Sequence, residues 1–242
     1  MRIRKLTAAL VAGAALAGSA AVASTAAATG SAQPASIVDI LVASAANNPP
    51  DSPTDSNWND QDILLAAASA LPFDAVNDPT GPTIAATLTG FTGTVFAPAD
   101  ASFRGLVADL TNTPIWKLSE ADVLNTLLTI AGGPDLAPGI SGAAALSETI
   151  RYHATAAQIP DLRRPKSRSV ETLTQLPDLD LSDGTFEIKR PFFSLVGLAD
   201  DDTNDLDPFA FGRTILATDG GTVHVIAGVL RPLDLALLFP GD

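Results

Sequence analysis

The sequence predicts an α+β fold, with helices first along the chain and paired strands after them. Up to Gly133, apolar residues recur at the three- and four-residue spacing of amphipathic helices. From Glu148 onward the spacing changes to two, and two Asp-Gly pairs indicate tight hairpin turns. Because helices and strands do not alternate, this order argues against a parallel βαβ architecture. The chain contains no internal repeat, so we expect one domain.

Five helices are predicted in the first part of the chain, beginning near Ser36, Asp62, Ile84, Asp100 and Ser119. Ser36 and Ser119 are each followed three residues later by Asp, the arrangement of a capping box. Asp100 is expected to cap a helix whose apolar residues recur three and four apart. Between the first two helices, residues 47–59 contain three prolines and several polar side chains. This composition predicts a surface loop.

Strands are predicted from the middle of the chain onward. Residues 94–97 form a short apolar run that Pro98 ends, as expected for a buried strand. Residues 148–155 alternate between apolar and polar side chains, which predicts a strand. Asp183-Gly184 and Asp219-Gly220 are predicted hairpin turns. The strands that these turns would join are 179–181 with 186–188, and 215–217 with 223–226.

The first 28 residues have the pattern of a secretory signal peptide. Arg2, Arg4 and Lys5 precede an Ala-rich apolar run, and small residues allow cleavage near 23–28. The apolar run is shorter than the about 20 residues that span a bilayer, although an uncleaved anchor is the alternative. We therefore expect a protein secreted to the periplasm or the extracellular space, without a transmembrane segment in the mature chain.

The charge of the chain disfavours two classes of partner. The formal net charge is −13, and loss of three basic residues with the leader makes the mature chain more acidic still. Such a surface repels the phosphates of nucleic acids and anionic lipid headgroups. The chain has no cysteine, so it has to be stable without disulfides, and its 46% hydrophobic content is sufficient for a core.

Three segments together resemble the signatures of the fasciclin domain family. Residues 93–103, Gly-Thr-Val-Phe-Ala-Pro-Ala-Asp-Ala-Ser-Phe, are similar to the first signature, and Tyr152-His153 is similar to a Tyr-His pair in the middle of the domain. Residues 221–230, Gly-Thr-Val-His-Val-Ile-Ala-Gly-Val-Leu, resemble the closing signature. The resemblance implies a fasciclin-type fold over residues 36–235, in which a β-sheet wedge is packed with a group of α-helices. It also implies an extracellular setting, with adhesion or matrix binding.

Tyr152 and His153 are candidate binding residues, because the corresponding pair in some animal relatives is tied to integrin-dependent adhesion. On a strand the two side chains would point to opposite faces. The structural alternative places Tyr152 in the core and has His153 bond to nearby backbone or to Asp100. His224, the only other histidine, is expected to be a buried structural residue.

Two charged segments are further candidates. Arg163, Arg164, Lys166 and Arg168 form a basic patch that could bind an acidic polymer or an acidic face of a partner, or could be a solvated loop. A second set, Asp200, Asp202 and Asn204, could form a weak, irregular calcium loop, or a solvated one. An EF-hand is excluded there, since Asp205 and Phe211 occupy the positions that require Gly and Glu.

The sequence favours a binding protein over an enzyme. It contains no nucleophile elbow, zinc-protease helix, phosphate loop or dinucleotide fingerprint. Two histidines and no cysteine disfavour haem, structural zinc and iron–sulfur sites, so no cofactor is expected. We expect a non-catalytic extracytoplasmic adhesion or matrix-binding module whose partner is a cell-surface or matrix protein or polysaccharide. The alternative is a soluble exported binding protein for a small ligand or polysaccharide.

Overall fold

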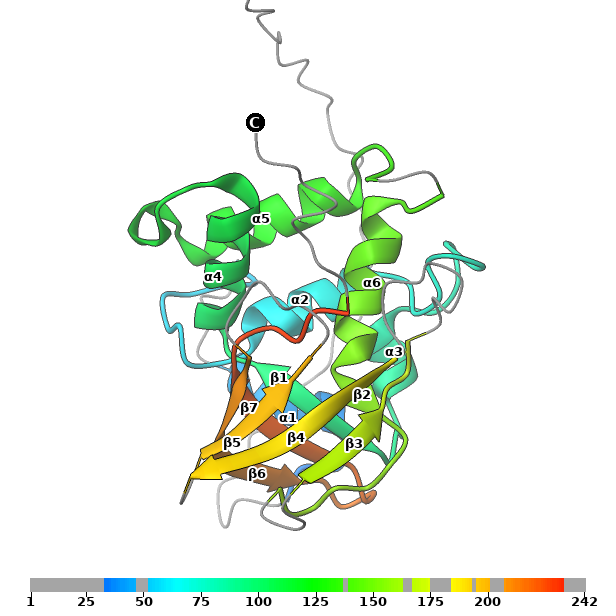
Figure 1. Cartoon of the computed structure of the whole chain (residues 1–242). Helices are drawn as coiled ribbons and strands as arrows, with labels where there is room; N and C mark the ends of the chain where they lie inside the picture. The colour runs from blue at the N-terminus through cyan, green and yellow to red at the C-terminus, as the bar shows by residue number, and fades with distance from the viewer. Residues whose placement is uncertain are drawn as a thin grey trace, which may run out of the picture. The chain divides into compact units, whose positions relative to one another are not determined.

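The computed structural model describes residues 33–46, 52–136, 139–162, 167–174, 184–192, 195–200 and 207–232 (Figure 1). All of them belong to one compact unit, Gln33–Asp242. Helices and strands occur together in this unit, which confirms the α+β class. The predicted signal peptide, 1–28, lies outside the described residues.

Helices dominate the first part of the described chain, as predicted. They are α1 (Ile37–Ser44), α2 (Asp62–Ala70), α3 (Ile84–Leu88), α4 (Asp100–Thr111), the 3-10 helix η1 (Ile115–Lys117), α5 (Glu120–Ala131) and α6 (Gly142–Tyr152). The capping box predicted at Ser36 is present, and the helix predicted to open at Ser119 and Asp122 also begins with one. Ser36 Oγ accepts a hydrogen bond from the Asp39 N–H at 3.1 Å, and Ser119 Oγ accepts one from the Asp122 N–H at 3.2 Å. Each Asp side chain bonds back to the serine N–H, so both donors at the helix start are satisfied.

The prediction that Asp100 caps α4 is wrong. Ala99 is the N-cap residue, no side chain bonds to the helix start, and Asp100 is the first helical residue. Its Oδ1 accepts a hydrogen bond from the Ile63 N–H of α2 at 3.1 Å. The Asp100 side chain therefore connects the start of α4 to the start of α2 and does not cap its own helix.

The prediction of a strand over 148–155 is also wrong. Helix α6 occupies the segment as far as Tyr152, and the strand that follows contains Ala154 and Thr155 alone. Helix α6 buries Glu148, Thr149 and Arg151 as well as Ile150 and Tyr152, so the apolar–polar alternation of this segment does not separate buried from exposed side chains. Ser141 Oγ accepts a hydrogen bond from the Ala144 N–H at 3.1 Å and fixes the start of the helix.

Seven strands of the described chain form one sheet. They are β1 (Thr94–Pro98), β2 (Ala154–Thr155), β3 (Ser167–Glu171), β4 (Thr185–Phe192), β5 (Leu195–Ala199), β6 (Phe209–Leu216) and β7 (Thr222–Ala227). The order across the sheet is β2-β1-β7-β6-β5-β4-β3. The β1–β7 pair is parallel, with Phe96 opposite His224, and every other pair is antiparallel.

Of the two predicted hairpins, one is confirmed. Asp219-Gly220 joins β6 to β7, and Gly220 has the positive φ of 98° that such a turn requires. After Gly184, strand β4 begins as predicted, but its described neighbours are β3 and β5. The other predicted strand of that hairpin, 179–181, lies outside the described residues.

Two hydrophobic cores meet on strands β1 and β7. Val95 and Ala97 of β1 pack into a core made mainly by the helices, whereas Phe96 between them packs into a core made mainly by β3 to β6. This is the alternation of side chains expected along a strand. Phe96 meets Phe186 of β4 edge to face, with ring centroids 5.0 Å apart. The central strands therefore connect the helices to the rest of the sheet.

Candidate functional site

The three segments that resemble fasciclin signatures meet around His153. The Phe96 N–H of β1 donates to the His153 carbonyl at 2.8 Å. The Leu230 N–H, just after β7, donates to His153 Nε2 at 2.8 Å. The Ala99 N–H donates to the Ile226 carbonyl of β7 at 3.1 Å. Residues far apart in the sequence thus form one hydrogen-bonded framework.

Tyr152 and His153 are both buried, with 0% and 2% of their surface exposed. They lie at the end of α6, so the expectation that they point to opposite faces of a strand does not apply. The Tyr152 hydroxyl donates to the Thr185 carbonyl. His153 Nδ1–H donates to the Thr149 carbonyl at 2.7 Å, which leaves Nε2 to accept from Leu230. The bonding partners of His153 are thus backbone groups, as predicted, and Asp100 is not among them.

Acid is expected to destabilise the fold through His153. Burial lowers the pKa of His153 from 6.5 to about 4, and the Thr149 carbonyl offsets part of this effect. As the pH falls from 6.5 toward 4, the unfolded chain binds a proton that the folded chain excludes, so the free energy of unfolding decreases. Between about pH 7.5 and pH 5 this one group removes about 2 kcal/mol.

Urea unfolding at both pH values tests this expectation. The matched variant is His153→Gln, whose amide can donate to Thr149 and accept from Leu230 but does not titrate. Every other titrating group is present in both proteins, so the wild type should lose about 2 kcal/mol more than the variant on acidification. An equal loss in the two proteins would contradict a neutral, buried His153.

The charged segments predicted from sequence lie largely outside the described residues. Arg163, Arg164 and Lys166 fall there, as do Asp202 and Asn204. Arg168 lies on β3 and is half-buried. Asp200 follows β5, and its Oδ2 accepts a hydrogen bond from the Arg231 N–H at 2.7 Å.

An exposed aromatic surface lies between α4 and α5. Trp116 of η1 is 75% exposed and Ile115 beside it is 44% exposed. Both line an open hollow of about 390 Å³, together with Gly105, Ala108, Asp109, Asn112, Thr113 and Pro114. These eight residues are called the Trp116 surface below. In the sequence this surface is marked only by Pro114, Ile115 and Trp116 between two predicted helices, which does not by itself indicate an exposed side chain.

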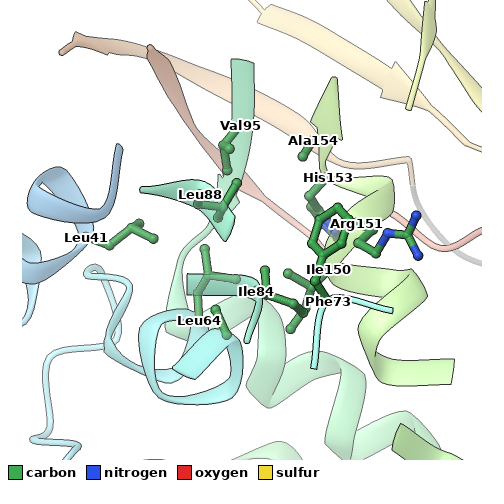
Figure 2. Close-up of a pocket in the computed structure, with 11 residues that line it drawn as sticks. Leu41, Leu64, Phe73, Ile84, Leu88, Val95, Ile150, Arg151, His153 and Ala154 are labelled. Atoms are coloured by element: carbon green, nitrogen blue, oxygen red, sulfur yellow. The ribbon is translucent and has the colours of Figure 1, made fainter. Parts of the chain in front are cut away.

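Two enclosed apolar pockets lined by described residues are too small for a ligand. One lies between α2, α3, β1 and the end of α6, and Figure 2 shows the side chains that line it. Another lies between α2, α4, α5 and α6. Each offers about 10 Å³ to the centre of a water-sized sphere, which is the limit for one water molecule.

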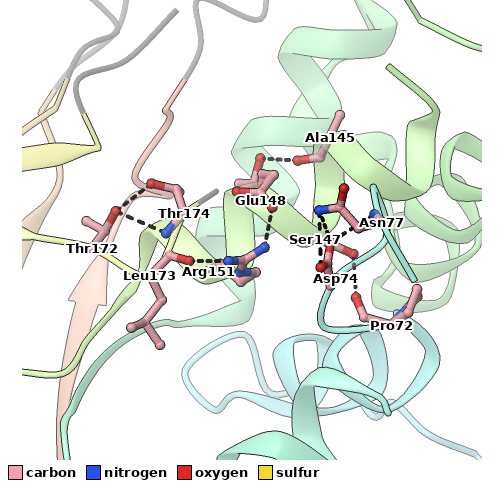
Figure 3. Close-up of polar contacts among 11 residues, drawn as sticks. Pro72, Asp74, Asn77, Ala145, Ser147, Glu148, Arg151, Thr172, Leu173 and Thr174 are labelled. Carbon is pink, nitrogen blue, oxygen red and sulfur yellow. Dashed lines mark hydrogen bonds and ion pairs between the residues drawn. The ribbon is translucent and has the colours of Figure 1, made fainter. Parts of the chain in front are cut away.

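Arg151 and Glu148 form a buried ion pair on α6. Each side chain is 1% exposed, and Arg151 Nη1 lies 2.5 Å from Glu148 Oε1. Arg151 Nη2 donates to the Leu173 carbonyl (Figure 3). The guanidinium also lies over the Phe73 ring, with Cζ 4.6 Å from the centroid. This pair ties α6 to the segment after β3 and to the segment after α2.

Five carboxyl groups gather where α2, α4 and α5 begin. This acidic cluster consists of Asp55, Asp60, Asp62, Asp100 and Glu120. Asp55 is half-buried, and the other four are at most 5% exposed. One oxygen each of Asp55, Asp62 and Glu120 lies within 4.8 Å of the others, and the same holds for Asp60, Asp62 and Asp100.

Several carboxylate oxygens of the acidic cluster have no hydrogen-bond donor among the described residues. These are both oxygens of Glu120, Oδ2 of Asp100 and Oδ1 of Asp60. No Lys, Arg or His of the described chain forms an ion pair with these three residues. Burial, followed by hydrogen bonding to Asp60 and the charge of Asp62, raises the pKa of Asp100 to about 11.

Burial also raises the pKa of Glu120, but to a smaller extent than that of Asp100. Burial raises the pKa of Glu120 to about 7, and the charges of Asp62 and Asp55 add to the rise. The Asp55 N–H opposes it in part, but this donor already bonds to Asp62 Oδ2 at 3.2 Å. An unpaired, buried carboxylate costs several kcal/mol, and a helix start offsets only about 0.3–1 kcal/mol of that. The cluster therefore requires protons or a cation.

Neither protein-family models nor curated proteins give a match to this chain. Among the described helices, none combines the length and the apolar character that crossing a bilayer requires.

Proposed function

We propose that the chain is a non-catalytic, secreted adhesion or matrix-binding module of fasciclin type, which contacts its partner through the Trp116 surface. The observation that carries this proposal is the 75% exposure of Trp116 beside an open hollow. Large aromatic side chains are usually buried, and they dominate the binding energy of protein interfaces when they are not. A cell-surface or matrix protein is the partner that such a surface fits best.

The shape of the hollow at Trp116 suits a protein partner better than a small ligand. A small-molecule site normally encloses several hundred Å³. The hollow at Trp116 has about that volume, 390 Å³, but is open, and the two enclosed apolar pockets described above offer about 10 Å³ each. The Asp109 side chain on this surface is paired with Arg231 at 3.0 Å, so its charge is compensated within the domain. The net charge of −13 of the whole chain favours a neutral or basic face on the partner.

The fasciclin-type assignment is supported by the arrangement of the three resembling segments. Segment 93–103 contributes β1 and the start of α4, and segment 221–230 contributes β7. The two strands are parallel neighbours, and both segments hydrogen-bond to His153. Residues shared by a family for structural reasons are expected to contact one another in this way. We therefore assign Tyr152 and His153 a structural role, and we place the contact with the partner elsewhere.

Trp116→Ala is expected to weaken binding of the purified mature domain to its producer's cells or extracellular matrix by about tenfold or more. The stability of the domain should change little, because Trp116 lies outside both cores. Saturation binding of labelled protein measures the affinity, and thermal unfolding checks the fold.

Val42→Ala is the matched control, since Val42 on α1 is also exposed, at 51%, and lies away from the Trp116 surface. It should bind like the wild type. Equal affinities for wild type and Trp116→Ala would show that the Trp116 surface does not contact the partner.

A further inference from the structure

We propose that Asp55, Asp62 and Glu120 bind a Ca²⁺ ion that ties the loop before α2 to the start of α5. One carboxylate oxygen of each residue lies within 4.8 Å of the other two. Ligands of one Ca²⁺, each 2.3–2.6 Å from the ion, are separated by distances of this size. Binding of Ca²⁺ at these residues is independent of the proposed adhesive function.

Of the three residues, Glu120 gives the strongest evidence for a bound ion. It is 1% exposed, and neither carboxylate oxygen receives a hydrogen bond from the described residues. It has no role in capping α5, because Ser119 and Asp122 complete the capping box of that helix. A glutamate with two free oxygens can chelate Ca²⁺ in bidentate fashion, as the last ligand of calcium loops commonly does.

Asp55 provides a route from solvent to this position. It is half-buried, whereas Asp62 and Glu120 are buried. The loop around it is folded by its own polar groups: the Asp55 N–H donates to Asp62 Oδ2, and the Asn57 N–H donates to Asp55 Oδ1. The bond to Asp62 holds the Asp55 backbone beside Asp62, and one carboxylate oxygen of each of these residues lies near Glu120.

The chemistry of the ligands favours Ca²⁺. Carboxylate oxygens select Ca²⁺, Mg²⁺ or Mn²⁺ over zinc, which prefers nitrogen and sulfur. The three ligands come from a loop and from the first residues of two helices. No single structural motif therefore imposes an octahedral arrangement on them. Mg²⁺ requires near-ideal octahedral geometry and retains its water, whereas Ca²⁺ tolerates irregular shells of six to eight oxygens.

The other trio, Asp60, Asp62 and Asp100, is less suited to be the ion site. All three side chains are at most 5% exposed, so none of them opens to solvent. Asp100 Oδ1 already accepts from the Ile63 N–H, and Asp60 Oδ2 accepts from Asn57 Nδ2 at 3.0 Å. We infer that Asp60 and Asp100 flank the ion and do not ligate it.

Calorimetric titration of the metal-stripped mature chain with CaCl₂ is the decisive measurement. We expect saturable binding with a dissociation constant between about 10⁻⁶ and 10⁻³ M, and much weaker binding of MgCl₂. At a Ca²⁺ concentration about 100 times that constant, the Tm should rise by about 5–10 °C and return on addition of EDTA.

Three variants locate the ion. Glu120→Gln keeps the shape of the side chain and should weaken Ca²⁺ binding at least about tenfold while the protein stays folded in EDTA. Asp100→Asn, which can still accept from Ile63, and Asp202→Asn, in the loop predicted from sequence, should bind Ca²⁺ like the wild type. If Glu120→Gln does not fold, Asp55→Asn takes its place in the titration.

Absence of Ca²⁺ binding by the wild type at millimolar concentration would overturn the proposal and leave the cluster to hold protons. Wild-type affinity in Glu120→Gln, or loss of binding in Asp100→Asn or Asp202→Asn, would overturn the assignment of the ligands. Saturable Ca²⁺ binding without adhesion would leave this inference intact and would count against the proposed function alone.

Discussion

Arg151→Met is expected to lower the Tm of the domain by about 6–20 °C, corresponding to about 3–5 kcal/mol. The substitution leaves Glu148, which is 1% exposed, as a buried charge without its cation. It also removes the hydrogen bond to the Leu173 carbonyl and the contact over the Phe73 ring. The larger part of the loss comes from the Glu148 carboxylate, since a buried charge that loses its ion-pair partner is far more costly than a missing contact.

A double variant separates the two contributions. In Glu148→Leu/Arg151→Met both charges are absent, so the double variant should be more stable than Arg151→Met alone. Lys189→Met is the matched control, because Lys189 and Glu187 form an ion pair at 3.4 Å whose side chains are 53% and 58% exposed. It should cost less than about 1 kcal/mol. Similar losses for Arg151→Met and Lys189→Met would show that the buried pair contributes little.

His153→Ala is expected to reduce the free energy of unfolding by about 2–4 kcal/mol. The imidazole connects the Thr149 carbonyl of α6 to the Leu230 N–H after β7, and Leu230 is fully buried. Alanine leaves this N–H without an acceptor and opens a cavity between the two elements. Chemical unfolding monitored by circular dichroism gives the loss directly.

The same variant distinguishes a structural from an adhesive role for the Tyr-His pair. With 2% exposure, His153 has almost no surface to offer a partner. At a temperature where His153→Ala remains folded, its binding to cells or matrix should therefore equal that of the wild type. Loss of binding by a folded, undestabilised variant would instead restore Tyr152 and His153 as contact residues.

Local signals were sufficient to predict the ends of several elements. The capping boxes at Ser36 and Ser119 correctly placed α1 and α5, and Asp219-Gly220 correctly placed the β6–β7 turn. In each case the residues that decide the structure are within four positions of one another. The α+β class followed from the same signals, because it depends on the order of elements and not on how they pack.

Features that depend on distant residues could not be predicted in this way. The last turns of α6 bury Glu148 and Arg151, whose charges pair with each other, and nothing within a few residues indicates that these polar side chains lie in the interior. The acidic cluster brings Asp55 together with Glu120, although each carboxylate on its own resembles an ordinary loop or helix-start residue. Asp100 was assigned to its own helix because nothing local indicates that Ile63 lies beside it.

Strand β7 has a consequence for how the chain reaches its folded state. It lies between β1, which precedes it by more than 120 residues, and β6, so in the strand order it joins β2 and β1 to the other four strands. Pairings at such long separation close large loops and slow folding. Neither core is complete until Val223 and Ile226 are in place, because one belongs to each core. Strand β7 therefore couples the two cores, and we expect both to remain incomplete until it has paired with β1 and β6.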